Sequence, residues 1–259
     1  MDIFRKIMTP ADGSVWITGA SAGIGRAVAI EMARRGWTVY ATARRAEPLE
    51  ALAVEQSKII PVPGDVTKLE DMIAAVDRIA QDGPLALAIF NAGIYKPMRA
   101  QTFSARDAKQ TFDVNLTGVA NGLEPVLQHM IERKEGHIAL VASVAGYRGL
   151  PNAVAYSPTK SGLIAMAEAL AMDLVDLGVR ISVINPGFVE TEATSVNEFK
   201  MPMLLQPEDA ARRIVEGLAK PGFEIRFPWA FAAFLRLIGA LPNRAYIWAV
   251  RKALGWDKV

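Results

Sequence analysis

The chain has 259 residues, 51% of them hydrophobic, which is enough apolar material for the core of one α/β domain or two small ones. Its 29 basic and 27 acidic residues leave a net charge of +2, so the overall charge does not indicate a nucleic-acid partner. The absence of cysteine excludes disulfides, thiolate zinc sites and a cysteine nucleophile, and it favours a cytoplasmic location.

Neither the histidines nor the apolar segments indicate a metal site or a membrane span. His129 and His137 lack the spacing that places two ligands on one helix face, so we expect no metal and interpret both as surface residues. The apolar start of the chain stops at Pro10, too early for the apolar core of an export signal. The longest apolar stretch, residues 227–241, contains Arg236 and is too short to cross a bilayer.

Short β-branched runs alternate with longer helical segments, which is the pattern of a parallel sheet with crossover helices. The runs are nearly continuous in hydrophobicity, as strands covered on both faces require. We predict strands at residues 14–18, 38–41, 58–62, 86–90, 137–142, 180–184 and 225–227. We predict helices at residues 24–35, 69–80, 108–132, 155–177 and 207–219. The expected fold is α/β, a single-domain Rossmann-type doubly wound parallel sheet over residues 1–225, followed by a helical extension over residues 226–259.

A glycine-rich segment, residues 18–25, follows the first predicted strand and leads into a helix. Glycine permits a tight turn and a close approach of the backbone to a pyrophosphate, whose charge the free amides of a helix N-terminus attract. Three glycines alone are weak evidence, because a structural turn needs the same residues. The candidate phosphate-binding residues are Gly19, Ser21, Gly23, Ile24 and Gly25.

The residues after the second predicted strand bear on the choice of dinucleotide. Thr42 occupies the place of the acidic residue that pairs with the ribose 2′-hydroxyl of NAD. Arg44 and Arg45 follow, and a guanidinium binds a 2′-phosphate through charge-assisted hydrogen bonds. These residues favour NADP(H), although a solvated basic pair in a surface loop would look the same.

Tyr156 and Lys160 lie four residues apart at the start of a predicted helix, so both side chains lie on one face. A free tyrosine titrates near about 10, so a nearby ammonium would make this one usable as an acid and base at neutral pH. The spacing is common by chance in a chain with five tyrosines. Ser143, at the end of the fifth predicted strand, could hold a substrate carbonyl at the same edge of the sheet.

Further motifs follow the other strands, and the whole set resembles the short-chain dehydrogenase/reductase family. The motifs are TGASAGIG (18–25), Asp65-Val66, Asn91-Ala92-Gly93, Val114-Asn115, Ser143, YSPTK (156–160) and Asn185-Pro186-Gly187. The resemblance covers about residues 12–225 and implies an NAD(P)-dependent oxidoreductase. It implies that Tyr156 is the acid/base, that Lys160 binds the nicotinamide ribose, that Ser143 orients the carbonyl and that Asn115 belongs to a proton relay.

The resemblance also implies the cofactor contacts. Asp65 with Val66 would hold the adenine, and Asn91, Ala92 and Gly93 the adenosine ribose region. The nicotinamide would lie against Pro186, Gly187, Val189 and Thr191. The chain departs from the family pattern in having Phe90 before the Asn91 motif, where asparagine is common, and no basic residue inside the glycine loop. The NADP(H) preference therefore depends on Arg44 and Arg45, with NAD(H) as the alternative.

The implied reaction is hydride transfer between the nicotinamide and a carbonyl or secondary alcohol carbon of a small molecule. The substrate loop would be residues 190–205, whose apolar side chains favour an apolar substrate, although simple packing of a lid explains them equally well. The apolar residues in question are Val196, Phe199, Met201, Met203, Leu204 and Leu205, with Tyr95, Tyr147 and Phe188 as further wall candidates.

The extension differs in composition from the rest of the chain. Residues 226–259 carry a net charge of +5 and three of the five tryptophans, whereas residues 1–225 carry −3. We predict two short amphipathic helices between about residues 228 and 256, broken at Pro242. They could lie in a membrane interface, or pack against a second subunit of a homo-oligomer or over the substrate cleft.

Two other functions fit parts of this pattern. A dinucleotide-sensing regulator would keep the fold without chemistry, but it would not need Asn115, Ser143, Tyr156 and Lys160 together. A nucleotide-sugar epimerase or dehydratase would use the same Tyr156 and Lys160 pair, but it calls for a longer segment after Asn185 than this chain has.

Overall fold

The computed structural model describes residues 6–196 and 201–253. Within them, seven parallel strands form one sheet in the order β3-β2-β1-β4-β5-β6-β7. The strands are β1 (Ser14–Thr18), β2 (Val39–Thr42), β3 (Ile59–Pro61), β4 (Leu85–Phe90), β5 (Gly136–Val141), β6 (Val179–Pro186) and β7 (Glu224–Phe227). The order reverses at β1, as in a doubly wound sheet, which confirms the predicted Rossmann-type fold.

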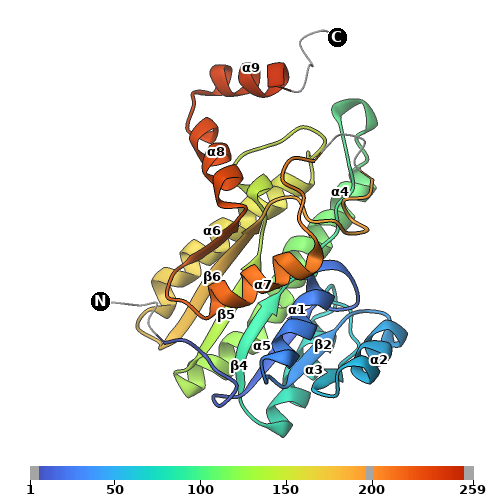
Figure 1. The fold of residues 1–259 in the computed structure, drawn as a ribbon, viewed down its shortest axis with the longest axis vertical. Helices are drawn as coiled ribbons and strands as arrows, with labels where there is room; N and C mark the ends of the chain where they lie inside the picture. Colours follow the sequence, from blue (N-terminus) through green and yellow to red (C-terminus); the bar gives the residue numbers. More distant parts are fainter. Residues whose placement is uncertain (1–5, 197–200, 254–259) are drawn as a thin grey trace.

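Helices cover both faces of the sheet (Figure 1). They are α1 (Gly23–Arg34), α2 (Ala46–Glu55), α3 (Leu69–Asp82), α4 (Ala105–Phe112), α5 (Gly118–Arg133), α6 (Tyr156–Leu174) and α7 (Pro207–Leu218). One apolar cluster lies between the sheet and α1 with α7, and the other lies between the sheet and α3, α5 and α6. Because strands alternate their side chains, each of the strands β1 to β6 contributes to both clusters.

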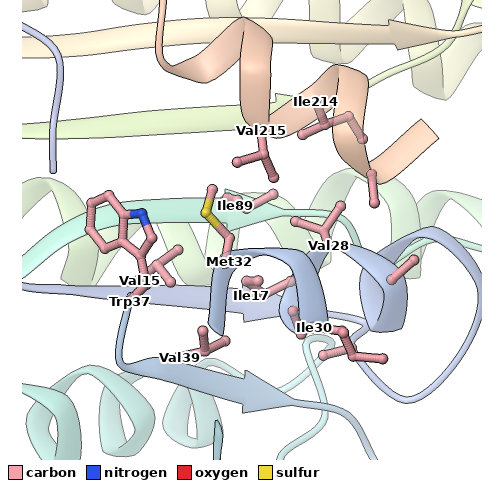
Figure 2. Packing of buried hydrophobic residues seen from close by; sticks show 14 of the residues in the cluster. Val15, Ile17, Val28, Ile30, Met32, Trp37, Val39, Ile89, Ile214 and Val215 are labelled. Carbon is pink, nitrogen blue, oxygen red and sulfur yellow. The ribbon is translucent and has the colours of Figure 1, made fainter. Parts of the chain in front are cut away.

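Figure 2 shows the first cluster, in which Val28 and Met32 of α1 and Val215 of α7 gather over Ile17 and Ile89 of the sheet. On the opposite face, Trp16 is fully buried with its ring edge-on to Phe90 at 5.7 Å between centroids. Full burial of a large apolar side chain contributes about 1.5–3 kcal/mol relative to exposure. Packing on both faces therefore fixes β1 and β4, whose carboxyl ends carry the candidate site.

Two features of the helices differ from the prediction. The predicted helix over residues 108–132 is α4 and α5 joined by a π-helical segment, Asp113–Thr117, which contains Asn115. α2 was not predicted, because its sequence has only two fully buried positions, Leu49 and Leu52, and so little periodic signal.

The interpretation of both histidines as surface residues is wrong for His137. This side chain is 1% exposed on β5, where its Nε2 lies 2.9 Å from the Ser182 hydroxyl. A neutral imidazole can be buried when a strand partner satisfies its polar nitrogen. His129 is half-buried on α5 and accepts a hydrogen bond from the Leu85 amide at 3.2 Å.

The extension forms the two predicted helices, α8 (Trp229–Gly239) and α9 (Asn243–Ala253), at the carboxyl end of the sheet (Figure 1). β7 continues to Phe227, so the sheet extends two residues past the predicted boundary at residue 225. Trp256, the predicted end of the second helix, lies outside the described residues. No helix in the described part of the chain is long and apolar enough to span a membrane.

Candidate active site

A cleft of about 710 Å³ opens at the carboxyl ends of the strands, beside the point where the strand order reverses. Ligands bind at this position in doubly wound sheets. All the candidate site residues line the cleft except Gly25 and Asn115. The lining candidates are Gly19, Ser21, Gly23, Ile24, Arg44, Arg45, Asp65, Val66, Asn91, Ala92, Gly93, Ser143, Tyr156, Lys160, Pro186, Gly187, Val189 and Thr191.

The glycine loop needs glycine at two close contacts. Gly19 has a left-handed backbone with φ of +69°, and a Cβ there would lie 2.7 Å from the Ala92 Cα. A Cβ on Gly25 would lie 2.2 Å from the Gly19 carbonyl oxygen, closer than real Cβ contacts allow. Gly25 does not line the cleft. Its missing side chain lets α1 pack tightly on the loop.

The loop is held in place from β4. The Asn91 side-chain amide donates hydrogen bonds to the carbonyls of Thr18 and Gly19, both at 3.1 Å. The Thr18 hydroxyl accepts from the backbone amides of Asn91 at 3.1 Å and Ala92 at 3.2 Å. Asn91 is therefore engaged with the loop itself, which fixes the loop before any ligand arrives.

The N-terminus of α1 fits a phosphate group. Ala22, the residue before the helix, has no side-chain hydrogen bond to the first turn, and Ala22, Gly23 and Ile24 all line the cleft. The amides of a first helical turn lack partners within the helix, so here they are available to an anion.

The rim of the cleft beyond β2 is basic. Arg44 and Arg45 are exposed on the lining, next to Ala43. Thr42 instead points into the core, where its hydroxyl accepts a hydrogen bond from the Trp16 indole at 2.8 Å. At the end of β2 the cleft therefore presents the methyl group of Ala43 and the guanidinium groups of Arg44 and Arg45. This composition fits a 2′-phosphate.

Asp65 follows β3 and carries a carboxylate on the lining. Burial raises the pKa of Asp65, but hydrogen bonds from the Thr67 amide and hydroxyl and the positive charge of Arg44 outweigh this effect and lower the pKa overall. The carboxylate is therefore ionised at neutral pH and oriented by Thr67, with one oxygen engaged in the turn.

Tyr156 begins α6, with its ring edge-on to Tyr95 at 5.0 Å between centroids and the Lys160 ammonium 5.5 Å from its ring centre. Burial raises the pKa of Tyr156 to about 12, against a smaller lowering effect of the Ser143 hydroxyl. The spacing of Tyr156 and Lys160 predicted a lowered pKa of Tyr156, and the structure differs because burial dominates. Tyr156 is thus protonated at neutral pH, the form that donates a proton.

Lys160 is 4% exposed and donates a hydrogen bond to the Val141 carbonyl at 2.8 Å. Burial lowers the pKa of Lys160 to about 8. A cation in this position attracts an electron-rich group that enters the cleft, since burial leaves it poorly solvated.

Ser143 and Asn115 are both buried next to this pair. The Ser143 hydroxyl accepts from the Ala145 amide at 3.1 Å and donates to the Pro186 carbonyl at 3.4 Å. The Asn115 amide donates to the Ile94 carbonyl at 2.9 Å, and its carbonyl accepts from the Ile94 amide at 2.8 Å. Asn115 therefore fixes the backbone behind Tyr156 and lies just outside the cleft.

Thr159 was not predicted as a site residue. Its hydroxyl donates to the Tyr156 carbonyl at 2.7 Å and accepts from the Asn115 amide at 3.2 Å, so it connects α6 to the π-helical segment. Its place inside YSPTK is the only signal that could have identified it.

Glu224 was also missed, and no local pattern marks it. One carboxylate oxygen accepts from the Tyr147 hydroxyl at 2.6 Å and the Asn185 amide at 2.7 Å. The other pairs with Arg226 at 2.8 Å and Arg236 at 3.0 Å. Glu224 thus joins the segment after Ser143, the end of β6 and helix α8. Tyr147, a predicted wall residue, is engaged in this network and does not line the cleft.

Comparison with known proteins agrees with this geometry. Residues 14–200 match the model of the short chain dehydrogenase family. An oxidoreductase from Myxococcus xanthus is 40% identical over 243 residues, covering 91% of this chain and 95% of the relative. A short chain dehydrogenase/reductase from Burkholderia phymatum, solved in complex with NAD, is 29% identical with a TM-score of 0.78, covering 89% of this chain and 94% of that chain.

A second solved structure shares the fold. The short chain dehydrogenase from Burkholderia cenocepacia, in complex with NADP, has a TM-score of 0.82 at 24% identity and covers 94% of this chain and 99% of that chain. The chain described here belongs to the short chain dehydrogenase family. It is an NAD(P)-dependent oxidoreductase, as the resemblance of its motifs predicted.

Proposed function

We propose that the enzyme reduces the carbonyl group of an apolar small molecule with NADPH, and that it catalyses the reverse oxidation of the secondary alcohol. The observation that carries the proposal is the gathering of Ser143, Tyr156 and Lys160 in one cleft with the open N-terminus of α1. When bound, the cofactor supplies the hydride that reduces the carbonyl carbon.

The protein's own residues donate the proton and orient the substrate. Tyr156 donates its hydroxyl proton to the carbonyl oxygen, and its high pKa keeps that proton available at neutral pH. Ser143 donates a hydrogen bond to the same oxygen. Lys160 holds a ribose hydroxyl and stabilises the phenolate left behind. Asn115 and Thr159 position the start of α6, and Asn115 belongs to the relay that reprotonates Tyr156.

The proposed preference for NADPH depends on Arg44 and Arg45. Both lie at the rim beyond β2, where an acidic residue would repel a 2′-phosphate. The Burkholderia phymatum relative was solved with NAD, so NADH is the alternative that the experiment must separate.

The test is a fluorescence titration that measures the affinities of NADPH and NADH for the unmodified enzyme and for the Arg44→Asp variant. Charge-assisted hydrogen bonds contribute about 1.5–3 kcal/mol, so we expect NADPH affinity to fall about 10- to 100-fold and NADH affinity to change little. Arg34→Asp on α1, also exposed but outside the cleft, is the matched control. Equal affinities of the unmodified enzyme for the two cofactors would remove the basis for the preference.

The proposed apolar substrate is supported by the walls next to Tyr156. Tyr95 and Val189 line the cleft. Val196, Met203 and Leu204 of the predicted substrate loop are exposed, and they follow the cleft residues 191–194 in the sequence. Phe199 of that loop lies outside the described residues. Turnover of ketones, aldehydes and steroids, followed at the nicotinamide absorbance, tests the class, and faster turnover of charged sugars would contradict it.

We further infer a cytoplasmic homo-oligomer in which residues 1–225 form the dinucleotide-binding and catalytic domain. The lack of cysteine supports the location, because disulfides do not persist in a reducing compartment and a protein there does not rely on them. Light scattering of the full chain tests the oligomeric state, and a monomer at micromolar concentration would contradict it.

A further inference from the structure

The two helices of the extension expose large apolar side chains to solvent. On α8, Trp229 is 67% exposed and Leu237 72%, with Phe234 between them. On α9, Ile247 and Trp248 are more than half exposed. Several large exposed apolar side chains on two successive helices mark a contact site, since single exposed residues are normal but such groups are not.

The exposed sides of these helices are held in a fixed orientation. The inner face of α8 packs Ala232 and Leu235 on Val144. The Tyr246 hydroxyl of α9 donates to the Gly149 carbonyl at 2.7 Å, and the Arg148 guanidinium lies 4.2 Å from the Tyr246 ring. Because these contacts involve the inner faces of α8 and α9, the apolar outer faces stay exposed and can contact a partner.

The charges identify the partner. Residues 226–259 carry +5 while residues 1–225 carry −3. Two of these basic residues, Arg226 and Arg236, pair with Glu224, so the charge that faces outward is that of α9. On α9, Arg244 and Lys252 are exposed next to Trp248, and the Lys252 ammonium lies 4.9 Å from the Trp248 ring centre. Short helices with tryptophan and basic residues together bind at the interface of anionic bilayers.

A second copy of the chain fits this surface less well. A two-fold interface pairs each surface patch with itself, so Arg244 and Lys252 would face basic residues of the other α9. An anionic lipid surface accepts the same cations with favourable charge and buries Trp248 and Ile247 at the level of the headgroups.

We propose that α8 and α9 form a docking surface for an anionic lipid membrane. The surface adjoins the catalytic cleft, because α8 packs on the segment after Ser143 and Phe231 lies 5.8 Å from Phe188, beside Gly187 of the cleft wall. Docking would hold the cleft close to lipid. The proposal does not depend on the cofactor or the substrate named above.

The experiment is sedimentation of the full-length enzyme with vesicles of phosphatidylcholine containing phosphatidylglycerol, and with vesicles of phosphatidylcholine alone. We expect binding only to the anionic vesicles, and weaker binding as salt rises. Arg244→Gln with Lys252→Gln should weaken binding about 25-fold, since each cation contributes about fivefold near an anionic surface. Leu237→Ser should weaken it further without unfolding, because that side chain is already exposed.

The matched control is Arg34→Gln with Arg213→Gln, which removes two exposed charges from α1 and α7. It should leave vesicle binding within about twofold. Full-length enzyme that ignores anionic vesicles, that binds both vesicle types equally, or that loses as much binding in the control as in the α9 variant overturns the proposal. A dimer that Leu237→Ser dissociates, with vesicle binding at background, assigns the surface to a second copy instead.

Discussion

The sheet and the C-terminal extension use tryptophan in opposite ways. Trp16 of β1 is completely buried and Trp37 nearly so, whereas Trp229 and Trp248 of the extension are about two-thirds exposed. The Trp16 indole also donates a hydrogen bond to Thr42, so even its polar atom is satisfied inside the protein. In the sheet, apolar surface stabilises the fold, and in the extension it is presented outward. Tryptophan therefore stabilises the core in the sheet and forms exposed surface in the extension. Substitutions in each region can test this difference.

The largest expected difference is chemical. Tyr156→Phe removes the proton donor and should lower kcat by about 10²- to 10⁴-fold, with cofactor affinity nearly unchanged because the lost hydroxyl acts in proton transfer. The matched change in the extension, Tyr246→Phe, removes a hydroxyl bonded to Gly149 and should leave kcat within about twofold. Steady-state rates and fluorescence titration measure both. More than a tenth of the activity remaining in Tyr156→Phe would refute the role of Tyr156.

The next difference concerns stability. Trp16→Ala should lower the free energy of unfolding by about 3–5 kcal/mol, since it leaves a cavity against Phe90 and an unpaired Thr42 hydroxyl. Trp248→Ala should change it by less than about 0.5 kcal/mol, because that ring is already in water. Urea unfolding monitored by circular dichroism compares the two. Similar losses would mean that α9 is part of the core.

A smaller effect is expected where the two regions meet. Glu224→Gln keeps an acceptor for Tyr147 but removes the charge that pairs with Arg226 and Arg236. We expect a loss of about 1–3 kcal/mol in unfolding free energy, since Glu224 is largely buried. Glu216→Gln on α7, at an exposed and loosely paired site, is the control and should cost less than about 0.5 kcal/mol. Equal effects would show that the Glu224 contacts contribute no more than a surface pair.

The smallest effect is a pH dependence confined to the sheet and its helices, since the extension has no histidine. Burial and the charge of Arg180 hold the pKa of His137 well below its ordinary value of 6.5. Below pH 6.5 the His137 side chain binds a proton in the unfolded chain but stays neutral in the folded chain. This contribution to stability is therefore complete above pH 6.5 and is lost as the pH falls. The limiting slope is about 1.4 kcal/mol per pH unit.

Urea titrations between pH 7.5 and 5 measure this slope, and His137→Gln should flatten the curve. His129, whose pKa is also lowered by burial, contributes in the same direction, so His129→Gln is the comparison variant. A curve unchanged by His137→Gln would contradict the assignment.

The sheet was predictable because most of its strands are nearly continuous in hydrophobicity, and the carboxyl ends of parallel strands gather at one edge. That rule predicts Ser143, Asn91 and Asp65 at one edge of the sheet, and all three line the cleft. Burial of His137 was not predictable, because it depends on the pairing of β5 with β6, which brings Ser182 next to it.

The contacts of Glu224 were hidden for the same reason. They join residues 147, 185 and 236, which only the finished fold brings together. The direction of the Tyr156 pKa shift also depends on packing, because spacing shows that Lys160 is near but not how much water is excluded.

The π-helical segment Asp113–Thr117 accommodates an extra residue within an otherwise regular helix. Deleting one residue from an α-helix normally turns everything beyond it by about 100° and misaligns the buried face. Here the same deletion would convert the widened turn to ordinary α-helix and leave α4 and α5 in their present alignment. The chain can therefore lose a residue at this point with little damage to its core, while Asn115 would be turned away from Ile94. Stability and activity are thus separable by the length of this single turn.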